Sequence, residues 1–349
     1  MRKFSLFLSM MVLLLMLAAC GGDKTSSGET NSEVVVGAWG GDYQQFLTDY
    51  VNPKFKEANS DTEVVYVPSD ASSRLTKLRV EKEGNGTFDV VQLSYDTIQE
   101  MIDEEIMMKL DYSKIPNSEN IKPNLENPYF VPHIYSAGVL LYNEKLVKEE
   151  PQSWEVLWDP KYKGKVGVYV DVFDRWLYAA AAVEGNTEGQ NWEKSWDKFA
   201  SITKQNPKFY TSQEALGTAL KTGEIALTIG WKSRAVQWNE SGGDPIGNTI
   251  PQEGTYPRIY GGGIPANAQN VEAAYDYLNA MLEPEAQVEF AANMGYDTTV
   301  VNAEMSDELI EDVGFSKEET KLVKSVDLGY VSENYAAWKQ KFDREIASE

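Results

Sequence analysis

The sequence predicts an α/β protein with two lobes. Runs rich in β-branched residues at positions 33–39, 63–67 and 88–93 have the length and composition of buried strands. Segments with apolar residues at helical spacing separate these runs, so strands and helices alternate. The alternation starts again at residues 165–170. This pattern is typical of a doubly wound sheet, and its second start indicates a second lobe.

The first lobe is expected to carry its helices between these strands. Apolar residues recur with a helical period at residues 46–51 and 75–80, and in the segment that begins at Asp96. An extended run follows at residues 131–143 and contains the single histidine, His133. We expect this run to connect the two lobes and His133 to be a buried structural residue.

The second lobe is expected to repeat the alternation, and the C-terminal part of the chain is expected to be helical. Each element is recognised by the period of its apolar residues. The expected elements are a strand at 165–170, helices at 174–183 and 191–202, a strand at 208–210, a helix from Ser212, a strand at 224–229, and tail helices at 271–282, 284–293 and 332–346.

The N-terminus has the pattern of a secretion signal. Arg2 and Lys3 precede an apolar run that ends in LAAC at Cys20 and is too short to span a membrane as a helix. LAAC followed by glycine resembles a bacterial lipobox, which predicts a signal peptide at residues 1–19 and a lipid on Cys20. Residues 20–33 carry the cysteine and then only polar residues and glycine, which predicts a flexible tether. We therefore expect a body anchored on the extracytoplasmic side of the cell membrane.

The composition restricts the classes of function. The net charge of -22 at pH 7 repels nucleic acid, and the 42% hydrophobic content is that of an ordinary soluble domain. The chain has one histidine and one cysteine, and it lacks the phosphate-loop and dinucleotide motifs and any cluster with metal-ligand spacing. We therefore expect no metal, no cofactor and no nucleic-acid partner, and a binding protein rather than an enzyme.

Aromatic and acidic residues gather just after the predicted strands. Ligands of open α/β sheets bind beyond the carboxyl ends of the strands, so residues at these positions are candidates for binding. In VDVFDRW, at residues 170–176, Asp171 and Asp174 follow a strand. Both acids are also favourable at the start of a helix. The two roles remain open, as does a hydrolase in which the paired carboxylates act on a glycoside.

Three longer blocks resemble a known family. Residues 153–166, 223–231 and 262–296 are similar, in sequence, order and spacing, to blocks of the spermidine/putrescine-binding proteins of ABC importers. The resemblance implies a type II periplasmic-binding-protein fold, in which two α/β lobes joined by a hinge close on a solute in the cleft between them. It also implies a monomeric receptor that delivers the solute to a membrane permease.

The resemblance also divides the body and indicates a binding site. Lobe 1 is expected to contain residues 34–133 and 261–307, and lobe 2 residues 134–260 and 308–349. In the family, acids hold the amine groups of the ligand and aromatic rings enclose its carbon chain. The residues that correspond to these contacts are Trp39, Tyr43, Tyr95, Asp171, Asp174, Trp231 and Tyr296.

One stretch departs from the family's pattern. Polyamine binders have a tryptophan and an essential aspartate shortly before the IP block, where this chain has Arg258 and Tyr260. A guanidinium repels a second ammonium group and suits a carboxylate or a phosphate. Two interpretations are open: the ligand is amphoteric and its anion binds Arg258, or Arg258 pairs with a neighbouring acid and points away.

The sequence therefore predicts an ABC-importer receptor for a small amine such as spermidine or putrescine. An amino-acid-like zwitterion, or another small solute that bears an anion, is the alternative ligand within that class. A ferric-ion receptor is disfavoured because no adjacent tyrosine pair is present to supply phenolate ligands. A secreted carboxylate-dependent hydrolase explains neither the tether nor the importer-like blocks.

Overall fold

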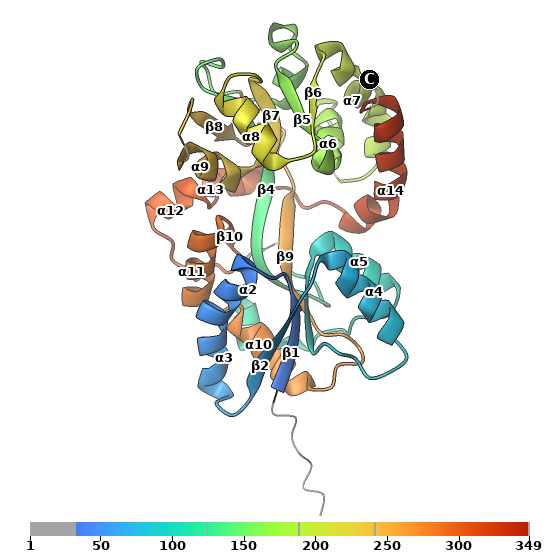
Figure 1. The fold of residues 1–349 in the computed structure, drawn as a ribbon, viewed down its shortest axis with the longest axis vertical. Coiled ribbons are helices and arrows are strands. Elements are labelled where there is room, and N and C mark those ends of the chain that lie inside the picture. The colour runs from blue at the N-terminus through green and yellow to red at the C-terminus, as the bar shows by residue number, and fades with distance from the viewer. Residues whose placement is uncertain (1–32, 124, 188, 241, 348–349) are drawn as a thin grey trace, which may run out of the picture. The chain divides into compact units, whose positions relative to one another are not determined.

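The computed structural model describes residues 33–347, apart from residues 124, 188 and 241 (Figure 1). Residues 33–349 form one compact unit, which we call the body. The predicted signal peptide, Cys20 and the predicted tether up to residue 32 lie outside the described residues.

The described strands form one hydrogen-bonded sheet. They are β1 (Glu33–Ala38), β2 (Glu63–Pro68), β3 (Val90–Ser94), β4 (Val131–Asn143), β5 (Val166–Tyr169), β6 (Lys208–Tyr210), β7 (Leu227–Trp231), β8 (Ile246–Thr249), β9 (Pro257–Gly263) and β10 (Asp297–Thr298). Their order is β2-β1-β3-β9-β4-β7-β5-β6, and β8 and β10 both pair with β4. We call the part around β1, β2 and β3 the first half of the body and the part around β5, β6 and β7 the second half.

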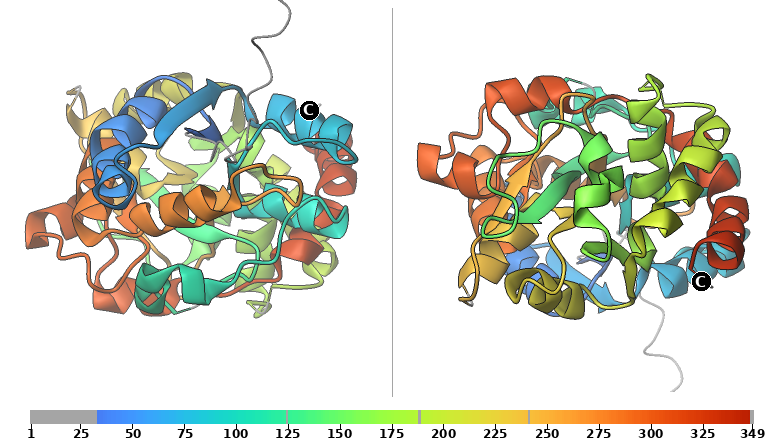
Figure 2. Two further views of the ribbon diagram at one scale, coloured as in Figure 1. Left: turned by 90° about the horizontal axis from the view of Figure 1, so that it is seen from below. Right: turned by 90° about the horizontal axis from the view of Figure 1, so that it is seen from above.

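The expected alternation of strands and helices is confirmed in both halves. In the first half β1 pairs in parallel with β2 and β3, and in the second half β5 pairs in parallel with β6 and β7. Figure 2 shows helices around the strands when the body is seen from either end. The α-helices are α2 (Asp42–Phe46), α3 (Asn52–Ala58), α4 (Ala71–Glu81), α5 (Tyr95–Asp103), α6 (Phe173–Val183), α7 (Trp196–Ala200), α8 (Gln213–Lys221), α9 (Lys232–Glu240), α10 (Val271–Ala280), α11 (Pro284–Met294), α12 (Asp307–Asp312), α13 (Lys317–Leu322) and α14 (Leu328–Glu345). A π-helix (Leu47–Val51) links α2 to α3, and short 3-10 helices lie at Tyr112–Lys114, Pro116–Asn120, Trp154–Trp158, Pro160–Tyr162, Val170–Val172, Trp192–Ser195 and Ser201–Gln205.

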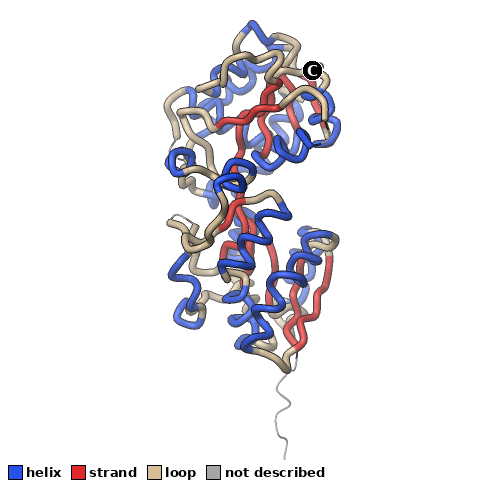
Figure 3. The backbone as a smooth tube through the Cα atoms, turned by 90° about the vertical axis from the view of Figure 1, so that its left-hand side faces the viewer, coloured by secondary structure: helices blue, strands red, loops and turns tan. Residues whose placement is uncertain are grey.

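The long strand β4 joins the two halves. Its residues from Val131 to Ala137 pair antiparallel with β9, and those from Gly138 to Tyr142 pair antiparallel with β7. Because β9 also pairs antiparallel with β3, the strands of both halves are continuous through β4 and β9. Figure 1 shows β4 running from one half of the body into the other, and Figure 3 shows strands in both halves with helices around them. The fold is the expected two-part α/β arrangement, with a sheet that is mixed at its centre.

Strand β9 is an element that the sequence pattern did not predict. It ends in Gly261, Gly262 and Gly263, and glycine is depleted in strands because it has no side chain to pack. Here the glycines allow a close approach, since a methyl group at Gly261 would overlap the carbonyl oxygen of Val131. At Gly263 a methyl group would meet the side chain of Met107 and the carbonyl oxygen of Tyr129 at 2.7 Å. The glycine run therefore permits a crowded central strand rather than a turn.

His133 is buried in β4, as expected. It is 0% exposed, and its ring lies 4.4 Å from the ring of Phe290 and 6.4 Å from that of Tyr43. Burial lowers the pKa of His133 to about 3, so the imidazole is neutral at pH 7. Among the described residues neither ring nitrogen has a hydrogen-bond partner, which suits an apolar packing role.

The C-terminal helix α14 contacts both halves of the body. It packs against α6 of the second half through stacked rings of Phe173 and Phe342, whose centroids lie 5.3 Å apart. It also packs against α5 of the first half, where Gly329 approaches the side chain of Gln99. The tail predicted to be helical therefore forms a wall next to the space between the halves.

Candidate binding site

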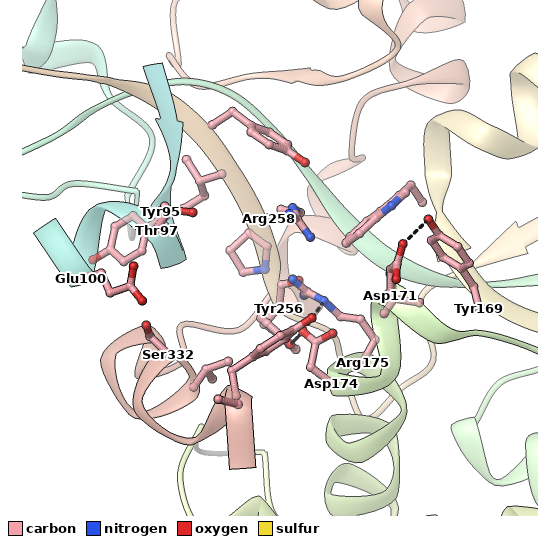
Figure 4. Close-up of a pocket in the computed structure, with 18 of the residues that line it drawn as sticks. Tyr95, Thr97, Glu100, Tyr169, Asp171, Asp174, Arg175, Tyr256, Arg258 and Ser332 are labelled. Carbon is pink, nitrogen blue, oxygen red and sulfur yellow. Dashed lines mark hydrogen bonds and ion pairs between the residues drawn. The ribbon is translucent and has the colours of Figure 1, made fainter. Parts of the chain in front are cut away.

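A cavity of about 580 Å³ is lined by residues from both halves and from β9 and α14 (Figure 4). This volume lies in the range of small-molecule sites. The lining residues are Leu75, Tyr95, Thr97, Glu100, Tyr169, Asp171, Val172, Asp174, Arg175, Gln213, Trp231, Tyr256, Pro257, Arg258, Ile259, Tyr260, Val331, Ser332, Tyr335 and Ala336.

The ends of three strands bring residues to this cavity. Tyr95 follows β3, Asp171 follows β5, and Trp231 is the last residue of β7. Two of these strands are parallel neighbours in the second half, so their carboxyl ends meet at one edge of the sheet. The cavity therefore lies where the strand-end rule expects a ligand.

Six of the nine predicted ligand contacts line the cavity, and three do not. The lining residues among them are Tyr95, Asp171, Asp174, Trp231, Arg258 and Tyr260. The other three, Trp39, Tyr43 and Tyr296, do not line it: Trp39 packs against Tyr43 and Tyr260, and Tyr296 packs against Tyr260. The binding role of all nine residues stays a prediction.

Trp39, Tyr43, Tyr260 and Tyr296 form what we call the aromatic cluster. The ring of Trp39 lies 5.1 Å from that of Tyr43 and 5.6 Å from that of Tyr260, and Tyr260 lies 5.8 Å from Tyr296, all edge to face. The guanidinium of Arg74, which is 0% exposed, lies 4.4 Å from the centroid of the Trp39 ring. Burial lowers the pKa of Arg74 to about 10. The cluster is a packed support from which Tyr260 reaches the cavity.

Asp174 is already bonded within the protein. The hydroxyl of Tyr256 donates to its Oδ2 at 2.5 Å, and Nε of Arg175 lies 3.4 Å from the same oxygen. Asp174 is 8% exposed and Arg175 is 7% exposed, so the two charges compensate each other in a buried setting. Asp174 lies in the first turn of α6, so it also has the expected position at a helix start, whereas Asp171 does not cap this helix, because Val172 occupies the N-cap without a side-chain bond.

Asp171 is the accessible acid of the predicted pair. It lies in a 3-10 turn before α6, it is exposed, and its Oδ2 accepts a hydrogen bond of 2.8 Å from the hydroxyl of Tyr169. The donor in this hydrogen bond is a neutral group, not a cation. Figure 4 shows Asp171 and Tyr169 together on one side of the cavity, away from Tyr95 and Glu100.

Two guanidinium groups flank the ring of Trp231. The guanidinium carbon of Arg175 lies 5.2 Å from the ring centroid, and that of Arg258 lies 5.6 Å from it. Arg175 also lies 3.4 Å from the ring centroid of Tyr256, to whose carbonyl oxygen it donates at 2.7 Å. Arg258, half-buried, is 5.5 Å from the ring of Tyr260 and lines the cavity.

Sequence reasoning missed several lining residues. Arg175 was overlooked although it stands beside Asp174 in an otherwise apolar helix, which is a signal for a paired buried charge. Glu100 also lines the cavity, and its carboxylate lies 3.2 Å from Arg79. Ser332 comes from α14, and no local pattern in the sequence indicates where that helix docks.

The described part of the chain offers neither a metal cluster nor a membrane span. No group of three or more His, Cys, Asp and Glu side chains there is arranged to hold a metal ion. None of the described helices has the length and apolar character needed to cross a bilayer. A second, more apolar cavity of about 460 Å³, with Lys122, Lys317 and Lys324 among its lining residues, shares Pro257 with the first.

Comparison with known proteins identifies the family. The family model described as bacterial extracellular solute-binding protein matches residues 53–317. The spermidine/putrescine-binding periplasmic protein of Escherichia coli K12 is 27% identical over 266 residues, which are 72% of this chain and 75% of the relative. The spermidine/putrescine-binding protein 1 of Haemophilus influenzae is 24% identical over 89% of this chain and 90% of its own length.

Solved structures have the same fold. The crystal structure of an ABC transporter protein from Clostridium perfringens superposes with a TM-score of 0.79 at 23% identity, covering 90% of this chain and 99% of that one. The family's members are receptors of ABC transporters and carry out no catalysis, and the relatives act in the periplasm or outside the cell. The fold, the two-sided cavity and the match over most of the body agree, and this chain belongs to the bacterial extracellular solute-binding proteins.

Proposed function

We propose that this protein is the receptor of an ABC importer for a small amine, which it binds through Asp171 in the cavity between its halves. The observation that carries the proposal is an accessible carboxylate at a cavity wall that also contains Trp231, Tyr95 and Tyr260. An ammonium group that leaves water needs a charged acceptor, and Asp171 supplies one. The aromatic faces add cation–π attraction of about 0.5–2 kcal/mol each.

The relatives' names supply the first ligands to test. Proteins named for spermidine and putrescine binding are similar to this chain over most of its length, so these amines are the natural starting compounds. Because residues 33–349 form one unit by themselves, protein lacking residues 1–20 is suitable for titration calorimetry. We expect one or more small amines to bind with a 1:1 stoichiometry.

The variant Asp171→Asn tests the assigned acid. A charge-assisted hydrogen bond contributes about 1.5–3 kcal/mol, so we expect the affinity for the bound amine to fall roughly 10- to 100-fold. Asp276→Asn is the matched control, because Asp276 is exposed on α10 and does not line the cavity. Unchanged amine affinity in Asp171→Asn, or a substrate turned over by the purified protein, would contradict the proposal.

We also propose that Cys20 carries a lipid and that the body works as a monomer on the extracytoplasmic face. A tether of this length spans on the order of 20 Å, which keeps the body near a membrane permease. We further propose that one lobe consists of residues 34–133 and 261–307 and that the other consists of residues 134–260 and 308–349. In cells, Cys20→Ala is expected to release the protein from the membrane fraction, and a variant that stays membrane-bound would refute the anchor.

A further inference from the structure

We propose that the amine bound in this cavity also carries an anionic group, which is held by Arg258 beside Trp231 while Asp171 holds the amine. The inference rests on the proposed function and names the class of its substrate: a short amphoteric compound, with a carboxylate or phosphonate at one end and an ammonium at the other. The geometry behind it is a cavity whose walls carry two guanidinium groups and, in Asp171, an exposed acid that accepts its hydrogen bond from a neutral hydroxyl.

Asp174 is committed to the protein and is a poor partner for a second amine. Its Oδ2 accepts the Tyr256 hydroxyl at 2.5 Å and lies 3.4 Å from Arg175. To bind Asp174, a ligand ammonium would have to displace or share its contacts with Tyr256 and Arg175. Disrupting such a buried, charge-compensated pair costs free energy. A diamine therefore finds one good acid in the second half rather than the two that the sequence pattern predicts.

Glu100 is equally unsuited to hold the second end of a diamine. It lines the cavity from the first half, but its carboxylate lies 3.2 Å from the guanidinium of Arg79 and is already paired with a cation. Asp171 is exposed like Glu100, but its hydrogen-bond donor is the neutral hydroxyl of Tyr169. Among the described lining residues the carboxylates are Glu100, Asp171 and Asp174, so Asp171 is the acid best placed for a ligand cation.

The middle of the cavity wall is positive. Figure 4 shows Arg258 between Tyr95 and Glu100 on one side and Asp171 on the other. A guanidinium keeps its charge in proteins and presents a planar fork that matches a carboxylate or a phosphonate. Arg175 supports the same preference, because it lines the same cavity and places a second guanidinium beside the ring of Trp231. A second ammonium at this place would face like charge.

The positive field extends behind the cavity. Burial raises the pKa of Tyr296, and the nearby guanidinium groups of Arg234 and Arg258 oppose that rise. Arg74 adds a third cation beneath Trp39. In a chain with a net charge of -22, a gathering of arginines around one face of the binding cavity favours an anionic group of the ligand there.

Calorimetry with a matched set of ligands tests the inference. The set is putrescine, 4-aminobutyrate, 2-aminoethylphosphonate, butylamine and butyrate, measured on protein lacking residues 1–20. We expect 4-aminobutyrate or 2-aminoethylphosphonate to bind at least about tenfold more tightly than putrescine, and more tightly than butylamine or butyrate. Which of the two binds better identifies the anion as a carboxylate or a phosphonate.

The variant Arg258→Gln locates the anion. We expect this variant to bind the amphoteric ligand at least about tenfold more weakly than the native protein does. Its affinity for putrescine is expected to be unchanged or higher. Arg344→Gln removes the same charge from an exposed position on α14 and is the control. If Arg258→Gln does not fold, Arg258→Lys keeps the charge and is expected to retain the preference over putrescine with a weaker affinity.

The outcomes separate the two proposals. This inference is overturned if putrescine binds more tightly than both amphoteric compounds and if Arg258→Gln binds all of these ligands as well as the native protein does. The proposal of an amine receptor would still hold in that case. If no compound with an ammonium group binds, the proposed function fails and this inference fails with it. Tight binding of butyrate and of no other compound has the same consequence, because butyrate contains no amine.

Discussion

The two sides of the cavity use the same kinds of residue in different ways. On the second half, Asp171, Asp174 and Arg175 line the cavity with Trp231, next to Arg258 of the central strand β9. On the first half, the aromatic cluster packs ring against ring, and it reaches the cavity through Tyr260. Rings can satisfy one another inside a wall, whereas charges need partners or water. Position after a strand therefore does not by itself distinguish a ligand contact from a support.

The strongest test of this comparison is the buried pair on the second half. Arg175→Met leaves Asp174 buried with Tyr256 as its remaining bonded partner, and an uncompensated buried carboxylate is costly. We expect the free energy of unfolding to fall by about 3–5 kcal/mol, measured by urea denaturation. The double variant Arg175→Met with Asp174→Leu removes both charges and is expected to recover much of the loss. A double variant as unstable as the single one would show that packing, not charge, is at stake.

Tryptophan replacements on the two sides should give opposite results. Trp39→Leu removes two edge-to-face contacts and the contact with Arg74, so we expect a loss of about 2–3 kcal/mol in stability. Its ligand affinity is expected to stay within about threefold, because Trp39 does not line the cavity. Trp231→Leu is expected to lower affinity about tenfold with a smaller change in stability. Calorimetry measures the ligand affinity of both variants, and thermal unfolding measures their stability. Equal losses of affinity in the two variants would place Trp39 in the site.

The first half should also contain a pH-dependent element. His133 packs against Phe290 and Tyr43, and its folded-state pKa of about 3 lies below the ordinary value of 6.5. Between these values the unfolded chain binds the extra proton, so acidification favours unfolding. Stability is expected to fall by about 2 kcal/mol more between pH 7 and pH 5 in the native protein than in His133→Leu. If the free energy of unfolding falls equally in the two proteins between pH 7 and pH 5, His133 is not the origin of the acid sensitivity.

The fold was largely predictable because strong local patterns specify its elements. The strands at residues 131–143 and 208–210 and helix α6 lie where apolar and β-branched runs indicate them. Strand β9 was not predictable from propensity, since its three glycines are favoured by the crowding of the neighbouring strands β3 and β4 and of the segments packed over them. That crowding is a tertiary property, and no window of sequence around Gly261 contains it.

The site was predictable at strand ends and at the positions that the family resemblance supplied. Asp171, Trp231 and Tyr95 were found in this way, and all three line the cavity. Arg175 and Tyr256 were missed because their role depends on a hydrogen-bonded network formed across a long stretch of chain. The contribution of α14 was missed for a similar reason: periodicity predicts a helix but not the surface on which it docks.

The smallest expected effect concerns the acid on the first half. Glu100→Gln removes a carboxylate from the cavity rim, but this group is exposed and already lies near Arg79. Exposed ion pairs contribute about 0.2–1 kcal/mol, so we expect less than about a threefold change in amine affinity and a stability loss below about 1 kcal/mol. Asp171→Asn, which also replaces an exposed lining acid, is the comparison. If Glu100→Gln lowers affinity as much as Asp171→Asn does, a ligand amine spans both halves, and the contrast between a binding wall and a supporting wall does not hold.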